Sequence, residues 1–331
     1  MPDTFWQRGL ANDSGQCRLC GATLGQRHFW TEVYANSGQQ LRRCGHCAGV
    51  YLAPGFTDQG LDEFYAEHYR QLFPAEVPWF SKERFFSWRG DRAVAQQRLQ
   101  LIAPQLAPGT RLFELGSGFG AFLGEAAAQR PDLQLLASEP DVTHCSTLLG
   151  RAQVHFVAGL DTLEPASLEG LVAFHTLEHV TAPLATLDLA ARALRPDGQL
   201  WIEVPDLFGD WTSRLFVHPA HLSYFCQESL RNLAQAAGFE ILSCGPHPLP
   251  SLHGNLWLHA RRPAALLQRP LHAETEQTIE AIDNRIMRVD WRLRDSLKAL
   301  AKRTAMRLLG PGAVGEWQRW RHRHPGGEPQ K

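Results

Sequence analysis

The sequence predicts an α/β protein built on a doubly wound, mostly parallel sheet. An apolar segment at 111–115 leads into a turn with three alternating glycines, Gly116, Gly118 and Gly120. Segments of strand character then alternate with helical segments as far as residue 260, which is typical of parallel strands joined by crossover helices. Two Cys-x2-Cys pairs precede this pattern, and a basic helical segment follows it.

Length and composition are those of a globular protein with more than one domain. The chain has 331 residues, of which 44% are hydrophobic and 20% charged, and this length favours about two domains. We divide the sequence into a cysteine module at 1–57, a helical lead-in or lid at 58–110, a catalytic α/β domain at 111–260 and a basic helical tail at 261–331.

Charge is distributed unevenly along the chain. Residues 261–331 contain 15 Lys and Arg against 8 Asp and Glu, a net charge of +7, which leaves −8 for residues 1–260. The larger part therefore offers no basic groove for nucleic acid. The first fifteen residues lack the apolar core of a signal peptide, and no run approaches the ~18 apolar residues of a membrane span. We expect a cytoplasmic protein.

Four of the seven cysteines form two pairs. Cys17 and Cys20 make one pair, Cys44 and Cys47 the other, and 23 residues separate the pairs. Two residues between thiolates let both sulfurs reach one ion, and four thiolates close a tetrahedral site, so the spacing predicts structural zinc. A redox disulfide and unliganded thiols remain the alternatives, and His46 is the nearby competing ligand.

In the lead-in, residues 58–110, the sequence predicts two helices with an aromatic segment between them. Leu61, Phe64, Tyr65 and Tyr69 share one side of a short helix. The aromatic residues between 73 and 88 are expected to pack in the core or to form a lid over a ligand. A second helix is expected from 91 to 106, just before Pro108 and Gly109.

The glycine turn predicts a ligand site. Gly116, Gly118 and Ala121 satisfy the dinucleotide pattern G-x-G-x-x-A, and Glu114 stands two residues before the first glycine. Glycine permits positive φ and a close approach of ligand to backbone. The helix that follows, 121–130, offers free N–H groups at its start. A glycine-rich turn without a ligand is the alternative.

Acidic residues follow the next two strands. The strand at 133–138 ends at Glu139, which lies 19 residues past Gly120. A carboxylate at this place can accept from both hydroxyls of a ribose, although a surface carboxylate remains the plain alternative. After the third strand, 154–157, Asp161 is placed to reach an adenine amino group.

The rest of the domain continues the alternation. A fourth strand at 171–174 ends in the block 175–180, and a long insertion at 207–225 follows the fifth strand. The remaining expected elements are a helix at 142–149, a helix at 183–194 that stops at the turn 195–198, a strand at 199–204, a helix at 227–237, and strands at 240–244 and 255–260 that pair as an antiparallel edge.

Together these residues resemble a known family. The domain is similar to class I S-adenosylmethionine-dependent methyltransferases, which have a Rossmann-like fold. The resemblance covers roughly residues 15–260. It rests on Glu114 with the glycines of 116–120, Glu139, the block 175–180, the turn 194–198 and the segment from His221 to Phe239. The cysteine pairs, with Phe64, Tyr65 and Tyr69, resemble the zinc-bearing subset, some of whose members methylate sugars or natural-product intermediates. The chain departs from that pattern at Ala48, where glycine is usual, and at Gly170, where an acid is usual.

The resemblance implies an S-adenosylmethionine cofactor. Its binding residues would be Glu114, Gly116, Ser117, Gly118, Gly120, Glu139, Asp161 and His175. The sulfonium carries its own activation, so the enzyme mainly aligns nucleophile, methyl carbon and sulfur, and positioning of this kind is worth ~7–11 kcal/mol. The acceptor is expected to be a small molecule, with a sugar or nucleotide-sugar as one candidate.

Histidine is the expected base if the acceptor must lose a proton, because its pKa lies near working pH. The candidates are His175, His179, His218 and His221. We prefer His221, because it lies in the insertion that would cover the acceptor, and place His179 second.

The tail carries an apolar stripe at helical spacing, among many basic residues. Its members are Ile279, Ile282, Ile286, Val289, Leu293, Leu297 and Leu300. Such a helix can dock on the rest of the chain, pair with a second copy in a homodimer, or contact an anionic membrane surface. Two other functions remain open for the whole chain, a nicotinamide-dependent oxidoreductase and a non-catalytic cofactor-binding scaffold.

Overall fold

The computed structural model describes residues 3–23, 25–30, 37–68, 91–140, 148, 153–209, 217, 219–265, 267 and 269–287. Several predictions fall outside these residues. They are the aromatic segment 73–88, nearly all of the helix at 142–149, His218, and the tail beyond residue 287.

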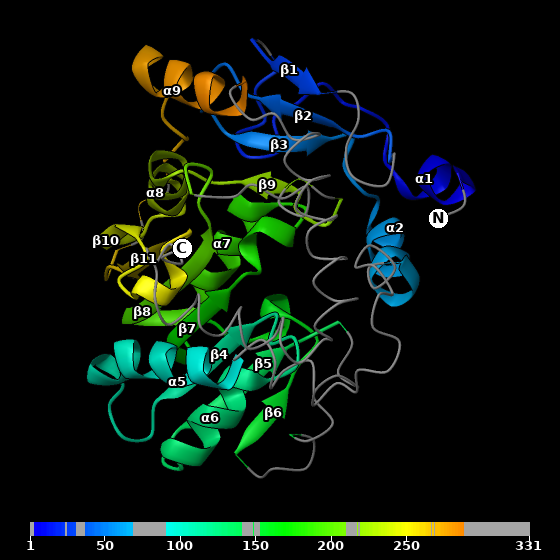
Figure 1. Cartoon of the computed structure of the whole chain (residues 1–331). Helices are drawn as coiled ribbons and strands as arrows, with labels where there is room; N and C mark the ends of the chain where they lie inside the picture. Colours follow the sequence, from blue (N-terminus) through cyan, green and yellow to red (C-terminus); the bar gives the residue numbers. More distant parts are fainter. Residues whose placement is uncertain are drawn as a thin grey trace, which may run out of the picture.

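A seven-stranded sheet forms the larger part of the structure, in the order β10-β11-β8-β7-β4-β5-β6. The β4–β5, β4–β7, β5–β6 and β7–β8 pairs are parallel, whereas β11 pairs antiparallel with both β8 and β10. This confirms the predicted fold class, and β10 with β11 is the expected antiparallel edge (Figure 1). The strands are β4 (Arg111–Leu115), β5 (Gln134–Ser138), β6 (Val154–Phe156), β7 (Leu168–Phe174), β8 (Leu194–Pro205), β10 (Glu240–Pro246) and β11 (Asn255–Arg261).

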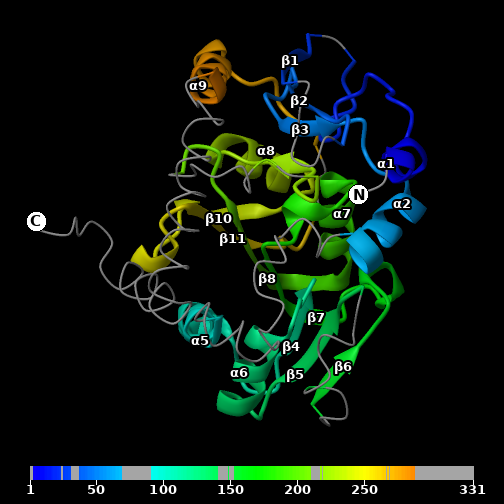
Figure 2. The same cartoon turned by 45° about the vertical axis from the view of Figure 1, so that its right-hand side comes forward.

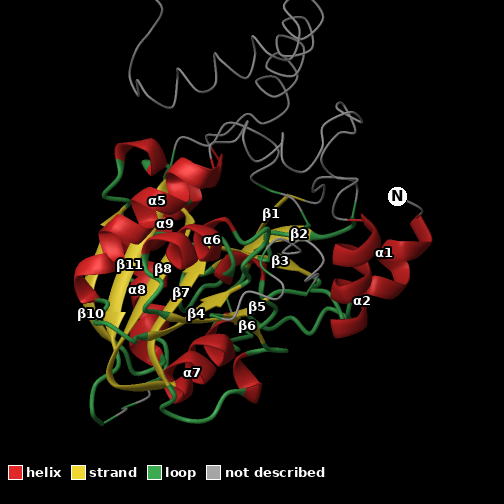
Figure 3. Cartoon of the chain, turned by 90° about the horizontal axis from the view of Figure 1, so that it is seen from below, coloured by secondary structure: helices red, strands yellow, loops and turns green. Residues whose placement is uncertain are grey.

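Helices cover both faces of this sheet. Side chains of neighbouring strand residues point to opposite faces, and in β4 the buried Leu112 packs with one helix pair while Phe113 packs with the other. Figure 3 shows α5 and α7 on opposite faces. The first pair is α5 (Asp91–Ile102), which continues as the 3₁₀ turn Ala103–Gln105, and α6 (Ala121–Gln129); the second pair is α7 (Pro183–Ala193) and α8 (Gln227–Ala236).

Strands β7 and β8 begin earlier than predicted, β7 at Leu168 and β8 at Leu194. The residues 195–198 were expected to form a turn before the strand, but β8 begins at Leu194. Its pairing with β7 passes from Leu194 directly to Gln199, and Asp197 has a φ of 64°. The turn residues therefore form a loop within a strand that has already begun. A local sequence signal does not distinguish such a loop from a turn that precedes the strand.

A second, four-stranded antiparallel sheet has the order β1-β2-β3-β9. Three of its strands come from the cysteine module, and the fourth comes from the insertion 207–225. In Figure 2 this small sheet lies above the large one. The insertion therefore completes the sheet of the cysteine module, which the sequence did not indicate. The strands are β1 (Arg27–Trp30), β2 (Gln40–Arg43), β3 (Val50–Ala53) and β9 (Ser223–Tyr224).

The predicted helix at 61–69 divides into α2 (Asp58–Glu63) and a π-helical turn, Phe64–His68. Phe64 is fully buried and packs with residues of the N-terminal helix α1 (Asp3–Gly9). Ala220 and Leu222 of the insertion belong to the same buried cluster. The first residues of the chain thus pack against the insertion as well.

The tail helix α9 (Glu276–Met287) docks on the small sheet (Figure 1). Ile282 and Ile286 are fully buried in one cluster with residues of β2 and β3. Asp283 accepts from Arg43 Nε at 2.7 Å and from Arg27 Nη1 at 2.6 Å. The described part of the stripe therefore packs within the chain. Among the described helices, none has the length and apolar character needed to cross a membrane.

We expect Asp283→Asn to loosen α9, because it leaves the buried Arg43 guanidinium without its counter-charge. Breaking a buried pair in this way costs on the order of 3 kcal/mol. Urea unfolding would measure the loss, and limited proteolysis would report whether the helix detaches. Glu280→Gln, an exposed change in the same helix, is the matched control. Equal stability of the two variants would mean that the ion pair does not hold the helix.

Candidate functional site

The glycine turn joins β4 to α6 and is tied to the end of β5. The amides of Gly116 and Ser117 donate to the Ser138 carbonyl at 3.0 and 3.2 Å. Gly116 has a φ of 67°, and a Cβ there would lie 2.6 Å from Thr176 Cγ2. Gly120, at φ 74°, is the N-cap of α6. Only glycine fits the first position, since both its φ and the close approach of Thr176 exclude a side chain.

The turn also contacts the predicted ribose acid. The Gly118 amide donates to Glu139 Oε2 at 2.8 Å. No atom lies within 4 Å of the place a Gly118 Cβ would occupy, so the space in front of this residue is open. Two residues that the sequence placed in one site are thus neighbours, beside a cradle in which a ligand can approach the backbone.

Glu114 is a buried carboxyl beside this cradle. Its Oε2 atom is buried and has no hydrogen-bond partner. Burial raises the pKa of Glu114 to about 8, with a further rise from Glu139, and the Arg98 guanidinium opposes the increase. A cationic ligand group would relieve this desolvation. The residue therefore suits the ammonium group of an amino-acid ligand.

Asp161 belongs to the segment that follows β6. It is exposed on the 3₁₀ turn Leu160–Thr162, and its carbonyl accepts from Arg192 Nη2 at 2.9 Å. Arg192 is in the last turn of α7. These contacts attach Asp161 to the end of α7, and its role at an adenine ring stays a prediction.

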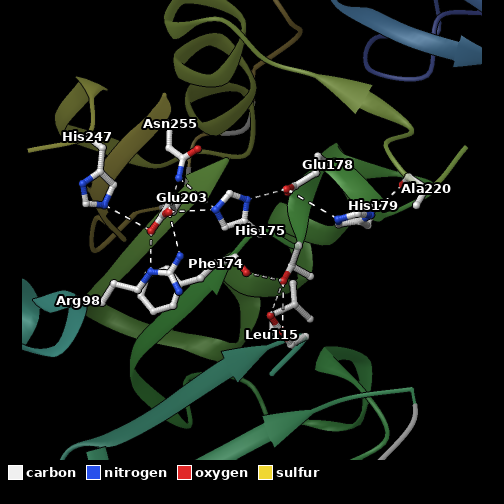
Figure 4. Close-up of polar contacts among 12 residues, drawn as sticks. Arg98, Leu115, Phe174, His175, Glu178, His179, Glu203, Ala220, His247 and Asn255 are labelled. Atoms are coloured by element: carbon white, nitrogen blue, oxygen red, sulfur yellow. Dashed lines mark hydrogen bonds and ion pairs between the residues drawn. The ribbon is translucent and has the colours of Figure 1, made fainter. Parts of the chain in front are cut away.

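His175 is clamped between two carboxylates at the end of β7 (Figure 4). Its Nδ1 lies 3.3 Å from Glu178 Oε1 and its Nε2 lies 3.1 Å from Glu203 Oε1. Burial by itself would lower the pKa of His175, but the two carboxylates outweigh burial and raise it to about 9. The side chain is 38% exposed. Because both ring nitrogens already have partners, His175 is held to shape the site and not to accept a proton.

Glu203 was not identified from the sequence. It is fully buried on β8 and receives Arg98 Nε and Nη2 at 2.7 and 2.9 Å and Asn255 Nδ2 at 2.6 Å. His247 accepts from an amide through Nδ1, so its proton is on Nε2, 3.4 Å from Glu203 Oε2. Burial would raise the pKa of Glu203, but His175, His247 and Arg98 hold it well below the usual range. The signal available in the sequence was the position of Glu203, a charged residue within an otherwise apolar predicted strand.

The two predicted catalytic histidines lie together. The rings of His179 and His221 are 4.9 Å apart, nearly perpendicular. His179 Nδ1 donates to the Ala220 carbonyl at 2.8 Å (Figure 4), and burial lowers the pKa of His179. The Tyr65 ring lies against His179 and the Tyr224 ring against His221. His221 and His179 therefore share one polar and aromatic environment, to which the lead-in and the insertion both contribute.

Backbone bonds fix the insertion beside this pair. The Leu222 amide donates to the Glu178 carbonyl at 2.8 Å, and the Leu52 amide donates to the Leu222 carbonyl at 3.0 Å. Arg18 bridges the same parts, with donations to the carbonyls of Thr181 at 2.9 Å and Leu52 at 3.2 Å. The cysteine module therefore positions the segment that carries His221.

The four cysteines meet as the spacing predicted. The Sγ atoms of Cys17, Cys20, Cys44 and Cys47 lie within 4.8 Å of one another. The Cys17–Cys47 and Cys20–Cys44 sulfurs are 3.7 and 3.6 Å apart. Sulfurs bound tetrahedrally to zinc at about 2.3 Å would be about 3.8 Å apart. Hydrogen bonds from the other three thiols, Cys17 first, lower the pKa of Cys44, and those from Cys17 and Cys47 lower the pKa of Cys20 to about 7. Hydrogen bonds within the same cluster raise the pKa of Cys17 and Cys47.

The backbone around the cysteines has the form of two metal knuckles. The Leu19 amide donates to Cys17 Sγ at 3.4 Å, and the His46 amide to Cys44 Sγ at 3.3 Å. His46 Nε2 contacts the Leu271 carbonyl at 3.2 Å, so its ring is engaged outside the sulfur cluster. Ala48, which replaces the usual glycine, has a φ of 52°. The fold thus keeps a glycine-like conformation at the position where the sequence departs from the family.

Comparison with known proteins finds similarity for the α/β part of the chain. Residues 87–244 match the family model of a methyltransferase domain. The match begins before β4, includes the glycine turn and the block 175–180, and ends within β10.

Relatives of the methyltransferase domain cover only parts of the chain. One match covers 33% of this chain. Over its 119 residues the chain is 32% identical to the ubiquinone biosynthesis O-methyltransferase of Xanthomonas campestris pv. campestris. The chain spans about half the length of the curated relatives it matches, 49%.

Solved structures show weaker likeness. A S-adenosylmethionine-dependent methyltransferase from Archaeoglobus fulgidus has 18% identity and a TM-score of 0.42, with 53% of this chain and 96% of that chain covered. One from Aquifex aeolicus has 15% identity and a TM-score of 0.42, with 50% and 88% covered.

Glu114→Gln should change how stability depends on pH. The ordinary pKa is 4.5 and the folded pKa is about 8. The unfolded chain thus loses this proton first, and wild-type stability falls as pH rises through that window. Because one unit of pKa corresponds to about 1.4 kcal/mol, we expect a relative gain for the variant on the order of a few kcal/mol between pH 5 and pH 9.

Urea unfolding at the two pH values would measure this gain. Glu240→Gln changes an exposed carboxyl and is the control, for which we expect no such change. The same pH dependence in wild type and Glu114→Gln would show that Glu114 does not titrate abnormally.

Proposed function

We propose that the protein transfers a methyl group from S-adenosylmethionine to a small-molecule acceptor. The supporting observation is the contact between Gly118 and Glu139. It joins the glycine turn to a strand-end acid within the segment that matches a methyltransferase domain. In parallel sheets, ligands bind at this edge, beyond the carboxyl ends of the strands.

The cradle suits the parts of this cofactor. The open space beside Gly118 would let the cofactor approach the backbone of the glycine turn, and the buried carboxyl of Glu114 would bind the ammonium group of the cofactor. Glu139 would accept from the ribose hydroxyls. When bound, the sulfonium supplies an activated methyl group. The proposed binding residues are Glu114, Gly116, Ser117, Gly118, Gly120, Glu139, Asp161 and His175.

The protein's own task is then positioning. Its rigid elements hold the acceptor in line with the methyl carbon and exclude water, which can be worth ~7–11 kcal/mol. The predicted proton acceptors are His221 and His179. The donation from His179 Nδ1 to Ala220 places the lone pair of that ring on Nε2.

For the acceptor we propose an oxygen nucleophile. The curated relative's name describes an O-methyltransferase, and its matched segment supports the same type of transfer here. A sugar, nucleotide-sugar or natural-product intermediate satisfies this description and follows from the zinc-bearing family resemblance. The net charge of −8 on residues 1–260 speaks against a nucleic-acid substrate.

We also propose that the four cysteines bind one structural zinc ion. Their sulfur spacing and the two N–H···S bonds fit a tetrahedral thiolate site without an open position. The described cysteines are all free thiols, which suits a reducing compartment, so a cytoplasmic location belongs to the proposal.

The alternatives have less support. A nicotinamide-dependent oxidoreductase would use the same glycine turn, but the family match is to a methyltransferase domain. A cofactor-binding scaffold would bind the cofactor without turnover. A homodimer or membrane contact through the tail would need an exposed apolar face, and in the part of the tail that the structure describes Ile282 and Ile286 are buried within the chain.

Isothermal titration with S-adenosylmethionine and S-adenosylhomocysteine tests the cofactor. We expect micromolar binding, weakened roughly 10- to 100-fold in Glu139→Ala, because lost hydrogen bonds to a charged acceptor are costly. Glu240→Ala, an exposed carboxyl elsewhere, should bind like wild type. No binding of either ligand by folded, zinc-loaded protein would refute the proposal.

Metal analysis tests the zinc site. We expect one zinc per chain, lost in Cys44→Ser together with a lower melting temperature, since zinc binding contributes folding energy. Cys244→Ser changes a free, half-buried thiol outside the cluster and should retain the ion. Unchanged zinc content in Cys44→Ser would disprove the assignment.

A further inference from the structure

We infer that Glu178, His179 and His221 form a second metal site, which binds a divalent cation beside the acceptor position. One ligand atom from each lies within 4.8 Å of the others. Glu178 is buried, while both histidines are partly exposed. The three side chains are therefore close enough to share one ion. How the cation is used rests on the proposed methyl transfer, whereas its binding does not.

The orientation of His179 suits a metal ligand. Its Nδ1–H donates to the Ala220 carbonyl at 2.8 Å, so the lone pair is on Nε2, which lies 3.8 Å from Glu178 Oε1. Metal-binding histidines usually donate their other ring N–H to a carbonyl or carboxylate in this way, which fixes the tautomer and the ring plane.

The carboxylate of Glu178 supplies an independent observation. The residue is 1% exposed, and its Oε2 atom is buried without a hydrogen-bond partner. A buried carboxylate oxygen without a donor is unfavourable. Its Oε1 already contacts His175 at 3.3 Å. The same Oε1 lies 3.8 Å from His179 Nε2. A cation held with His179 and His221 would neutralise the charge of this carboxylate.

The backbone holds the ligands in place before any ion binds. Glu178 and His179 are on the 3₁₀ turn Leu177–His179, and His221 directly precedes Leu222, whose amide donates to the Glu178 carbonyl at 2.8 Å. A site whose ligands come from two segments joined by such a bond is preorganised.

The ligand chemistry separates this site from the cysteine cluster. Two imidazoles and one carboxylate favour ions such as Zn²⁺, Fe²⁺, Mn²⁺ or Co²⁺ over the oxygen-seeking Mg²⁺ and Ca²⁺. Four thiolates leave no open position, whereas three ligands leave at least one. The second site can therefore bind a substrate atom.

The open position would bind the acceptor hydroxyl and lower its pKa. The hydroxyl proton leaves to water, the oxygen bonds the methyl carbon as the carbon–sulfur bond of the sulfonium breaks, and sulfur keeps the electron pair. His179 and His221 would then be metal ligands, and no histidine base would be needed. Acceptors with a second oxygen beside the hydroxyl would chelate the ion and be preferred.

Titration with Co²⁺ tests the site in full-length protein whose cysteine cluster is already filled with zinc. We expect one further equivalent of Co²⁺, with visible d–d bands but no thiolate charge-transfer band. Affinity should fall roughly 100-fold or more in His221→Ala and in Glu178→Gln, since loss of outer-shell partners alone costs 10–100-fold. His253→Ala, an exposed histidine on another loop, should bind Co²⁺ like wild type.

Each outcome decides the inference. Wild-type protein without the extra equivalent, or equal binding by wild type, His221→Ala and Glu178→Gln, overturns it. Circular dichroism checks that the variants are folded, and Glu178→Gln keeps the size of the side chain. Titration with S-adenosylmethionine on the same samples separates the two proposals: cofactor binding without the second Co²⁺ overturns only the metal site, and Co²⁺ binding without the cofactor overturns only the methyl transfer.

Discussion

The buried charge of Glu203 constrains the arrangement of the whole catalytic part. A carboxylate taken fully out of water must find cationic and hydrogen-bonding partners, or it destabilises the fold. Here the partners are Arg98 from α5, His175 from the end of β7, Asn255 from β11 and His247 from the loop between β10 and β11. The Glu203 carboxylate thereby links a helix, two other strands and a loop to β8. It also holds His175 at a positive φ of 54°, so the block that follows β7 has a single defined direction.

Local patterns predicted the parts of the site that are encoded locally. The glycine turn, the acid Glu139 and the four cysteines depend on spacing and on strand ends, and the structure brings each group together. The Glu203 network and the β9 pairing depend on segments far apart in the chain, which no single window of sequence contains. For the same reason the sequence placed His179 in the block 175–180 and His221 in the insertion, but did not show that their rings lie 4.9 Å apart.

The candidate site is built from residues of more than one of the regions into which we divided the sequence. Its proposed cofactor side belongs to the glycine turn and the large sheet, whereas His221, which we propose for the acceptor side, belongs to an insertion that is paired with the cysteine module through β3 and β9. Cys17, Cys44 and Cys47 also pack in the same buried cluster as α7 and α8. A structural ion in the module would therefore stabilise the acceptor side of the site directly, through backbone pairing and shared core.

The pairing of β3 with β9 and the docking of α9 have a consequence for biosynthesis. The small sheet needs residues 50–53, 223–224 and 282–286 for its pairing and its buried side chains. Its first strands leave the ribosome long before the partners that cover them. Such contacts between distant segments must overcome a large loop-closure entropy and form late. The cysteine module can thus complete its core only after synthesis has passed residue 286, and a nascent chain that stops before this residue would carry the cysteines without a finished active site.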